Sequence, residues 1–171
     1  MTRVELLRSL ASRLAAPGER ISMADHAAIR RMDSAAPASA ARAVYSLLAD
    51  VGMPLDEADD IDRWILLVHA LALARGAHDP SVFIGDALIK IHFGEARLQQ
   101  LLSADRALLA DLVPRLARRL SSQQQRMDFA PLMRLLMAVD RDTEEAEAAR
   151  LAIARSFVVA NQKQNQSRKT V

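Results

Sequence analysis

The sequence contains no cysteine among its 171 residues. This absence excludes disulfide bonds, iron–sulfur clusters, cysteine-ligated zinc and thiol nucleophiles. The first residues do not form the basic stretch, apolar run and cleavage site of a secretory leader, so we expect a cytoplasmic protein.

Aromatic residues and glycine are also scarce. Aromatic residues make up 4% of the chain (four Phe, one Trp and one Tyr), so the core must consist mainly of aliphatic side chains. Almost no aromatic ring is left to serve as a stacking platform for nucleic-acid bases. Five glycines are too few for a glycine-rich loop that cradles phosphate. The longest nearly unbroken apolar run, 64–74, is much shorter than the about 20 residues that span a membrane, so no membrane partner is expected.

Apolar residues at helical spacing are abundant. Hydrophobic residues make up 51% of the chain, and they recur at three- and four-residue steps, as Leu6, Leu10 and Leu14 do. This period predicts about eight helices. The segment 81–93 has a strand-like composition, but no partner strand is evident, so we expect a helix there as well. The predicted fold class is all-α.

Several polar residues stand where helices are expected to begin. Ser22, Ser39 and Asp128 are candidate N-caps, because their side chains can accept hydrogen bonds from free main-chain N–H groups. Asp142 and Glu145 have the spacing of a capping box for the last helix.

Two features interrupt the helical pattern. The segment 33–37 contains Asp, Ser and Pro and is predicted to be a loop. Pro114 lies inside a helical pattern over 105–120 and predicts a kink or a break there.

The pattern divides into two small helical-bundle lobes. The segment 76–80 (Gly-Ala-His-Asp-Pro) is the predicted linker between an N-terminal lobe, 1–75, and a C-terminal lobe, 81–160. The tail, 161–171, has almost no apolar residues and is predicted to be disordered.

Charge is distributed unevenly along the chain. Residues 1–85 carry 9 Arg and 11 acidic residues, whereas residues 86–171 carry 11 Arg, 3 Lys and 10 acidic residues. Arg forms planar, forked hydrogen bonds to phosphate. A GC-rich genome would also produce many arginines, so charge alone leaves a nucleic-acid partner open.

Catalytic motifs are missing. His26, His69, His78 and His92 stand on separate segments, without the spacing of a zinc protease or the GxSxG motif of a serine hydrolase. We expect His69 to be a core residue and His92 to lie at the surface. The acidic cluster at 56–62 suits the start of a helix better than a metal site. We therefore expect no enzyme activity, metal, cofactor or small-molecule substrate.

The arginines of the second half are the remaining candidates for a site. Arg115, Arg118 and Arg119 lie at three- and four-residue steps and project from one side of a helix. The simpler interpretation of Arg115 is an ion pair with Asp111 at i,i+4. Phosphate contacts need only well-placed cations, so any binding is expected to be electrostatic and indifferent to base sequence.

Several short motifs occur in a recognisable order. They are Ala28-Ile29-Arg30-Arg31, Val44-Tyr45-Ser46-Leu47-Leu48, Ile84-Gly85-Asp86-Ala87-Leu88, Glu95-Ala96-Arg97-Leu98, Leu101-Leu102-Ser103-Ala104-Asp105-Arg106, the segment 115–120, and Asp128-Phe129 followed by Leu132, Arg134 and Leu136. With this order the chain resembles the small, CasB-type subunit of Cascade, the type I-E CRISPR surveillance complex, over about residues 4–160.

This resemblance implies a non-catalytic subunit that acts in antiviral defence. It implies two copies packed end to end, contacts with the large and backbone subunits, and binding to guide RNA and target DNA. Members of the family hold the displaced non-target strand and brace the guide–target hybrid, which stabilises the R-loop. The residues to which the resemblance and the spacing assign nucleic-acid binding are Arg30, Arg31, Arg97, Arg106, Arg115, Arg118, Arg119 and Arg134.

Two other interpretations remain open. A helical protein–protein adaptor without nucleic-acid contacts predicts arginines that are paired with acids or scattered. A small helical hydrolase predicts a pocket in which His69 or His92 meets carboxylates.

Overall fold

The computed structural model describes residues 2–32, 38–55 and 58–169. Within these ranges the chain forms nine α-helices and no strand, which confirms the all-α class. The predicted loop at 33–37 and part of the acidic cluster at 56–62 lie outside the described residues. The helices are α1 (Arg3–Ala15), α2 (Met23–Arg30), α3 (Ala38–Asp50), α4 (Ala58–Ala74), α5 (Ile84–Lys90), α6 (Glu95–Leu102), α7 (Arg106–Ser122), α8 (Ala130–Ala138) and α9 (Thr143–Lys169).

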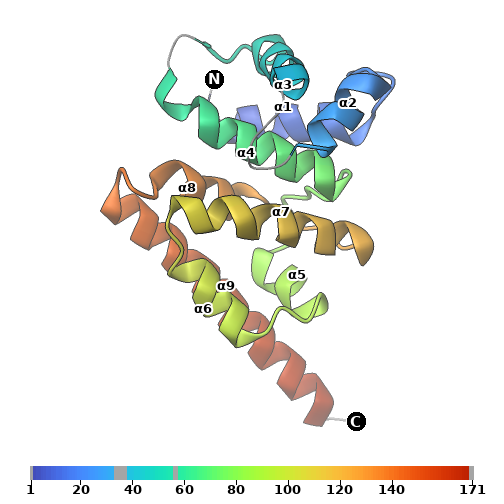
Figure 1. The fold of residues 1–171 in the computed structure, drawn as a ribbon. Helices are drawn as coiled ribbons and strands as arrows, with labels where there is room; N and C mark the ends of the chain where they lie inside the picture. Colours follow the sequence, from blue (N-terminus) through green and yellow to red (C-terminus); the bar gives the residue numbers. More distant parts are fainter. Residues whose placement is uncertain (1, 33–37, 56–57, 170–171) are drawn as a thin grey trace.

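Helix α4 lies at the centre of the molecule. Figure 1 shows α1, α2 and α3 on one side of α4, and α7 and α8 on the other, with α5, α6 and the long α9 beyond them. Trp64, Leu67, Val68 and Leu71 of α4 are all buried, because both sides of the helix are covered. The buried residues form one continuous cluster that extends from α1 to α9. The lobe boundary at 76–80 stays a prediction.

Two of the predicted helix caps are present. The Ser22 hydroxyl accepts from the Asp25 N–H at 3.0 Å, and Asp142 accepts from the Glu145 N–H at 2.9 Å. The N-cap of α8 is Phe129 and not the predicted Asp128, which stands one residue earlier and accepts from the Ala130 N–H at 2.9 Å. The prediction for Ser39 is wrong, because α3 begins at Ala38 and Ser39 lies inside the helix.

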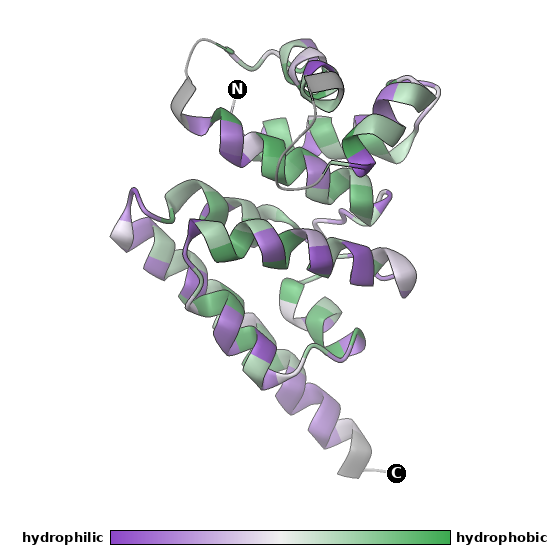
Figure 2. Ribbon diagram, in the orientation of Figure 1, coloured by the Kyte–Doolittle hydropathy of each residue, from purple (hydrophilic) through white to green (hydrophobic). Residues whose placement is uncertain are grey.

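Two elements are longer than predicted. Helix α7 continues through Pro114 without a break. Helix α9 continues to Lys169, so 161–169 is not the disordered segment that its composition predicts. Figure 2 shows this last stretch as a hydrophilic extension beyond the packed helices. Gln, Lys and Arg are good helix formers, and adding turns to a helix already nucleated by packing costs little.

The predicted linker is fixed by hydrogen bonds to the loop that precedes α8. The Met127 N–H donates to the Ala77 carbonyl at 2.8 Å, and the Asp79 N–H donates to the Met127 carbonyl at 3.0 Å. Within this connection, Nδ1 of His78 accepts from the Phe129 N–H at 3.2 Å. Burial lowers the pKa of His78, and this effect outweighs the opposite effect of Asp128, whose Oδ1 lies 4.0 Å from Nδ1.

The buried His78 predicts acid sensitivity. Because its pKa is lower in the folded than in the unfolded chain, the unfolded chain takes up the proton first as the pH falls below about 6.5. Folding stability should therefore fall progressively from that pH downwards, and protonated Nδ1 can no longer accept from Phe129. His78→Asn, which keeps an acceptor but does not titrate, should flatten the dependence in urea unfolding between pH 7 and 5. Gln100→Asn, a change at an exposed site that involves no titrating group, is the control and should leave the slope unchanged.

Helices α5 and α9 approach each other closely at Gly85. The Gly85 N–H donates to the Ser156 hydroxyl at 2.9 Å. A Cβ atom at position 85 would lie 2.1 Å from the Ser156 carbonyl oxygen, which belongs to the main chain and cannot move without moving α9. Only glycine therefore permits this packing.

Gly85→Ala should lower the free energy of unfolding by about 2 kcal/mol or more, because the clash exceeds the gain in helix propensity. Gly94→Ala is a matched control: a Cβ there meets no atom within 4 Å, and the change at this N-cap should cost about 1 kcal/mol or less. Urea unfolding of both variants tests this. Equal losses for the two would contradict the packing assigned to Gly85.

A buried arginine links α4 to the end of α8. Arg63 is 4% exposed, and its guanidinium donates to the carbonyls of Leu136 at 2.5 Å and Val139 at 2.7 Å. These carbonyls lie at the C-terminal end of α8, where no helical N–H reaches them and where a positive charge is favourable. Burial and the neighbouring arginines lower the pKa of Arg63, but from so high a value that the side chain stays charged.

Replacement of Arg63 by Met should destabilise the protein by about 3 kcal/mol, because two buried carbonyls lose a charged donor. Arg13→Met is the control, since Arg13 also donates to a main-chain carbonyl, that of Asp50, but at the surface. The control should cost about 0.5 kcal/mol or less in the same urea titration. A similar small loss for Arg63→Met would show that this contact does not hold α4 to α8.

Candidate nucleic-acid interface

A cleft of about 540 Å³ opens where α4 faces α7 and the end of α8. We call it the α4–α7 cleft; the position of the two helices is visible in Figure 1. Its wall combines arginines and aspartates with apolar side chains. The lining residues are Met32, Asp62, Arg63, Ile65, Leu66, His69, Arg106, Ala110, Asp111, Pro114, Arg115, Arg118, Leu136 and Val139.

Three of the predicted arginines meet in this cleft. Arg106, Arg115 and Arg118 all extend from α7, which Asp105 caps by accepting from the Leu108 N–H at 2.8 Å. With Arg63, the described residues of the lining include four arginines and two aspartates, Asp62 and Asp111. These described side chains together carry an excess of two positive charges.

The carboxylates of the cleft form exposed ion pairs. Arg106 lies 2.9 Å from Asp62, and Arg115 lies 3.7 Å from Asp111. The second pair confirms the predicted i,i+4 contact. All four side chains are more than half exposed, so each of the two ion pairs stabilises the protein by about 0–1 kcal/mol. Another anion can therefore readily replace the aspartate in either pair. Across the described residues, no hydrogen bond or ion pair involves the Arg118 side chain.

The adjacent Arg119 turns away from the cleft. Its guanidinium donates to the His92 carbonyl at 3.3 Å, next to the end of α5. The spacing predicted Arg115, Arg118 and Arg119 on one side of the helix, but the packing of α4 against α7 separates Arg119 from the other two.

The other four predicted residues lie on different helices and do not line the cleft. Arg97 on α6 and Arg134 on α8 are exposed. Arg31 is exposed at the end of α2, where its main-chain N–H caps the helix. Arg30 is half-buried, and burial together with the nearby charge of Arg75 lowers the pKa of Arg30.

The sequence analysis missed the role of Arg63 in forming the cleft. A signal was present, because Arg63 occurs directly before Trp64 and four residues before Leu67, on the face of α4 that is buried. An arginine at such a position requires internal acceptors. Which acceptors it finds depends on α8, far away in the sequence.

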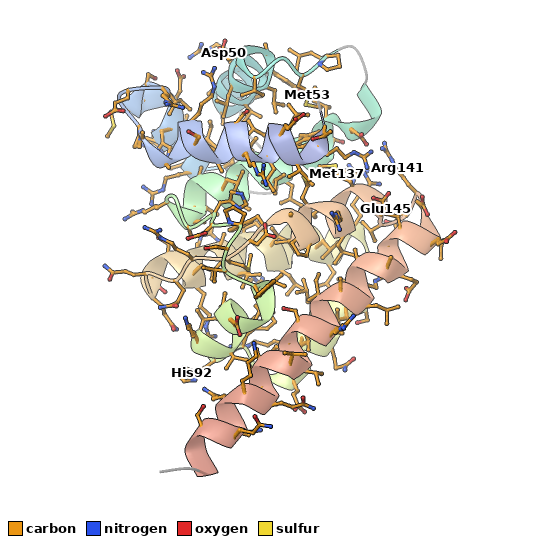
Figure 3. All side chains as sticks on the ribbon, turned by 180° about the vertical axis from the view of Figure 1, so that it is seen from behind. Asp50, Met53, His92, Met137, Arg141 and Glu145 are labelled. Carbon is orange, nitrogen blue, oxygen red and sulfur yellow. The ribbon has the colours of Figure 1, made fainter. Side chains whose placement is uncertain are left out.

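The hydrolase interpretation requires His69 or His92 to meet carboxylates in a pocket. His69 is 4% exposed, as predicted for a core residue, and lines the cleft together with Asp62 and Asp111. His92 is exposed, and Figure 3 shows it at the opposite end of the molecule from Arg141. Among the described residues that line the cleft there is no serine, threonine or tyrosine to act as a nucleophile.

The described residues contain no group of three or more His, Cys, Asp or Glu residues arranged to hold a metal ion. None of their helices is long and apolar enough to cross a membrane.

The fold and the cleft define an all-α protein with an arginine-lined groove. The family model described as CRISPR-associated protein Cse2 matches residues 25–157, from α2 into α9. The chain therefore belongs to the Cse2 family, the small subunits of type I-E Cascade in CRISPR defence. The comparisons with curated proteins and with solved structures give no match.

Proposed function

We propose that the α4–α7 cleft binds the sugar–phosphate backbone of an unpaired nucleic-acid strand, and that the chain thereby stabilises the R-loop of Cascade. The strand is the non-target DNA strand that is displaced when guide RNA pairs with the target. The observation that carries the proposal is the convergence of Arg106, Arg115 and Arg118 on one cleft with surplus positive charge.

The electrostatics of the cleft support this proposal. A phosphate that approaches Arg106 or Arg115 replaces a weak, exposed ion pair with a charge-assisted hydrogen bond. The Arg118 guanidinium forms no hydrogen bond or ion pair within the described residues, so it can bind a phosphate without losing a partner. A flexible single strand can follow the cleft more closely than a stiff duplex can.

Modest binding energy is sufficient for such a role. The exchange of a DNA duplex for an RNA–DNA hybrid is nearly balanced in free energy, so contacts to the displaced strand shift the balance towards the open R-loop. Holding the strand also slows its return to the target. No chemical step is required.

The remaining predicted arginines extend the proposed surface. Arg97, Arg119 and Arg134 belong to the C-terminal helices, and Arg30 and Arg31 to α2. In our proposal they contact phosphates that lie outside the cleft, on the displaced strand or near the hybrid with guide RNA. A second copy of the chain, packed end to end and bound to the large and backbone subunits, lengthens this surface. Membership of the Cse2 family supports these partners.

The proposal predicts the effect of removing the three cleft charges. The variant with Arg106, Arg115 and Arg118 replaced by Gln should bind single-stranded DNA at least about tenfold more weakly at low salt. The slope of log affinity against log salt should fall by about 2, because each lost contact to a single strand contributes about 0.7. Fluorescence anisotropy at several salt concentrations measures both quantities.

A matched variant controls for net charge. Arg20, Arg42 and Arg155 are exposed and do not line the cleft, so their replacement by Gln removes the same charge elsewhere. This control should retain most of the affinity. If the two variants lose affinity equally, the cleft is not the binding site; if neither loses any while both still join the complex, the adaptor interpretation is correct.

A further inference from the structure

The wall of the α4–α7 cleft has two chemically different parts. Arg106, Arg115 and Arg118 provide the charged part along α7. Between them on α7 lie Ala110 and Pro114, and the rest of the apolar lining comes from α4 and the end of α8: Ile65, Leu66, Leu136 and Val139. Phosphate groups need only the charged part. The apolar part is suited to a ligand that carries a planar, largely apolar group in addition to its phosphates.

The size of the cleft limits what this group can be. Its volume of about 540 Å³ falls within the range of about 300–1,000 Å³ that is typical of sites for small ligands. The space is large enough for one nucleoside and too small for stacked base pairs. A base within a duplex is also unavailable, because it is paired and stacked.

We propose that the cleft takes the base of a single unpaired nucleotide out of the bound strand. The base lies against Leu66, Ala110 and Pro114, and the phosphates on either side of it contact Arg106, Arg115 and Arg118. This inference rests on the function proposed above and adds the ligand that the apolar wall selects. The protein then distinguishes unpaired from paired DNA by the presence of a free base as well as by flexibility.

The lining also predicts how the base is recognised. None of the described residues that line the cleft is Phe, Tyr or Trp, so the base does not stack on an aromatic ring. Aliphatic side chains and a guanidinium plane contact any base equally well. The site should therefore accept all four bases with similar affinity, as a subunit that holds strands of arbitrary sequence requires.

The test removes bases without changing the phosphate charge. The probe is a single-stranded DNA of about 12 nucleotides, within the site size of single-strand-binding domains. A second probe has the same length and the same number of phosphates, with a tetrahydrofuran abasic residue at every position, so that no shift of the strand can place a base in the cleft. The full-length chain should bind the abasic strand about fivefold more weakly in fluorescence anisotropy, since apolar contacts of the bases are lost. Equal affinity for the two strands overturns the inference, and this comparison needs no variant.

A substitution that fills the cleft provides the second arm. Ala110→Phe places a ring where the base is proposed to lie, whereas Ala107→Phe adds the same ring one turn earlier on α7 at an exposed position outside the cleft. Ala110→Phe should bind the ordinary strand as weakly as the unmodified chain binds the abasic strand, and should no longer distinguish the two. Ala107→Phe should behave like the unmodified chain. Unchanged discrimination in Ala110→Phe contradicts the inference.

The two proposals fail in different ways. In one outcome, replacement of the three cleft arginines weakens binding to both strands, but the unmodified chain binds the abasic and the ordinary strand equally well. The proposed contact with the backbone is then correct, and the proposed base site is wrong. If the arginine variant retains full affinity for both strands, the proposed function itself is wrong.

Discussion

The arrangement of the helices depends on a buried guanidinium whose hydrogen-bond acceptors, among the described residues, are main-chain carbonyls and not carboxylates. Arg63 projects from the central helix α4 and donates to two carbonyls at the end of α8. A charge removed from water needs such acceptors, so α4 and α8 are held in one relative position. A second contact strengthens the same junction at the surface. Asp60 of α4 pairs with Arg3 at 3.3 Å and with Arg141, and Figure 3 shows Arg141 and Glu145 where α8 passes into α9. These contacts join the first helices to the last.

The same junction explains why the arginines of this chain have different roles. The acidic excess of the first half and the basic excess of the second half partly neutralise each other across the junction, through Asp60 with Arg141 and Asp62 with Arg106. Arg141 therefore serves mainly to connect helices. Arg115 and Arg118 stand further along α7, and among the described residues that line the cleft Asp111 is the carboxylate paired with Arg115. The described lining therefore keeps surplus positive charge on this part of α7, and our proposal assigns phosphate binding to that surplus.

Much of the fold follows from local patterns. The apolar period predicts the helices, and short-range rules locate the caps at Ser22 and Asp142, because a cap depends on neighbours about three residues away. Local rules failed where stability comes from elsewhere. The polar stretch 161–169 is helical because α9 has already formed before it.

The site was only partly predictable for the same reason. Spacing placed Arg118 and Arg119 together, but Arg118 faces the cleft and Arg119 faces the end of α5. That division depends on which side of α7 is covered by α4, a contact between segments about 50 residues apart.

In our proposal the cleft connects this architecture to the function of a Cascade small subunit, because helices hold its cations at fixed positions beside apolar side chains. Positions fixed in advance reduce the entropy lost when a flexible strand binds.

The most direct measurement is permanganate reactivity of thymines in the displaced strand of an assembled Cascade R-loop. We expect a segment of that strand to be protected by the unmodified chain and to become reactive when Arg106, Arg115 and Arg118 are replaced by Gln. Protection that persists unchanged in a fully assembled complex with this variant would contradict the role assigned to the cleft.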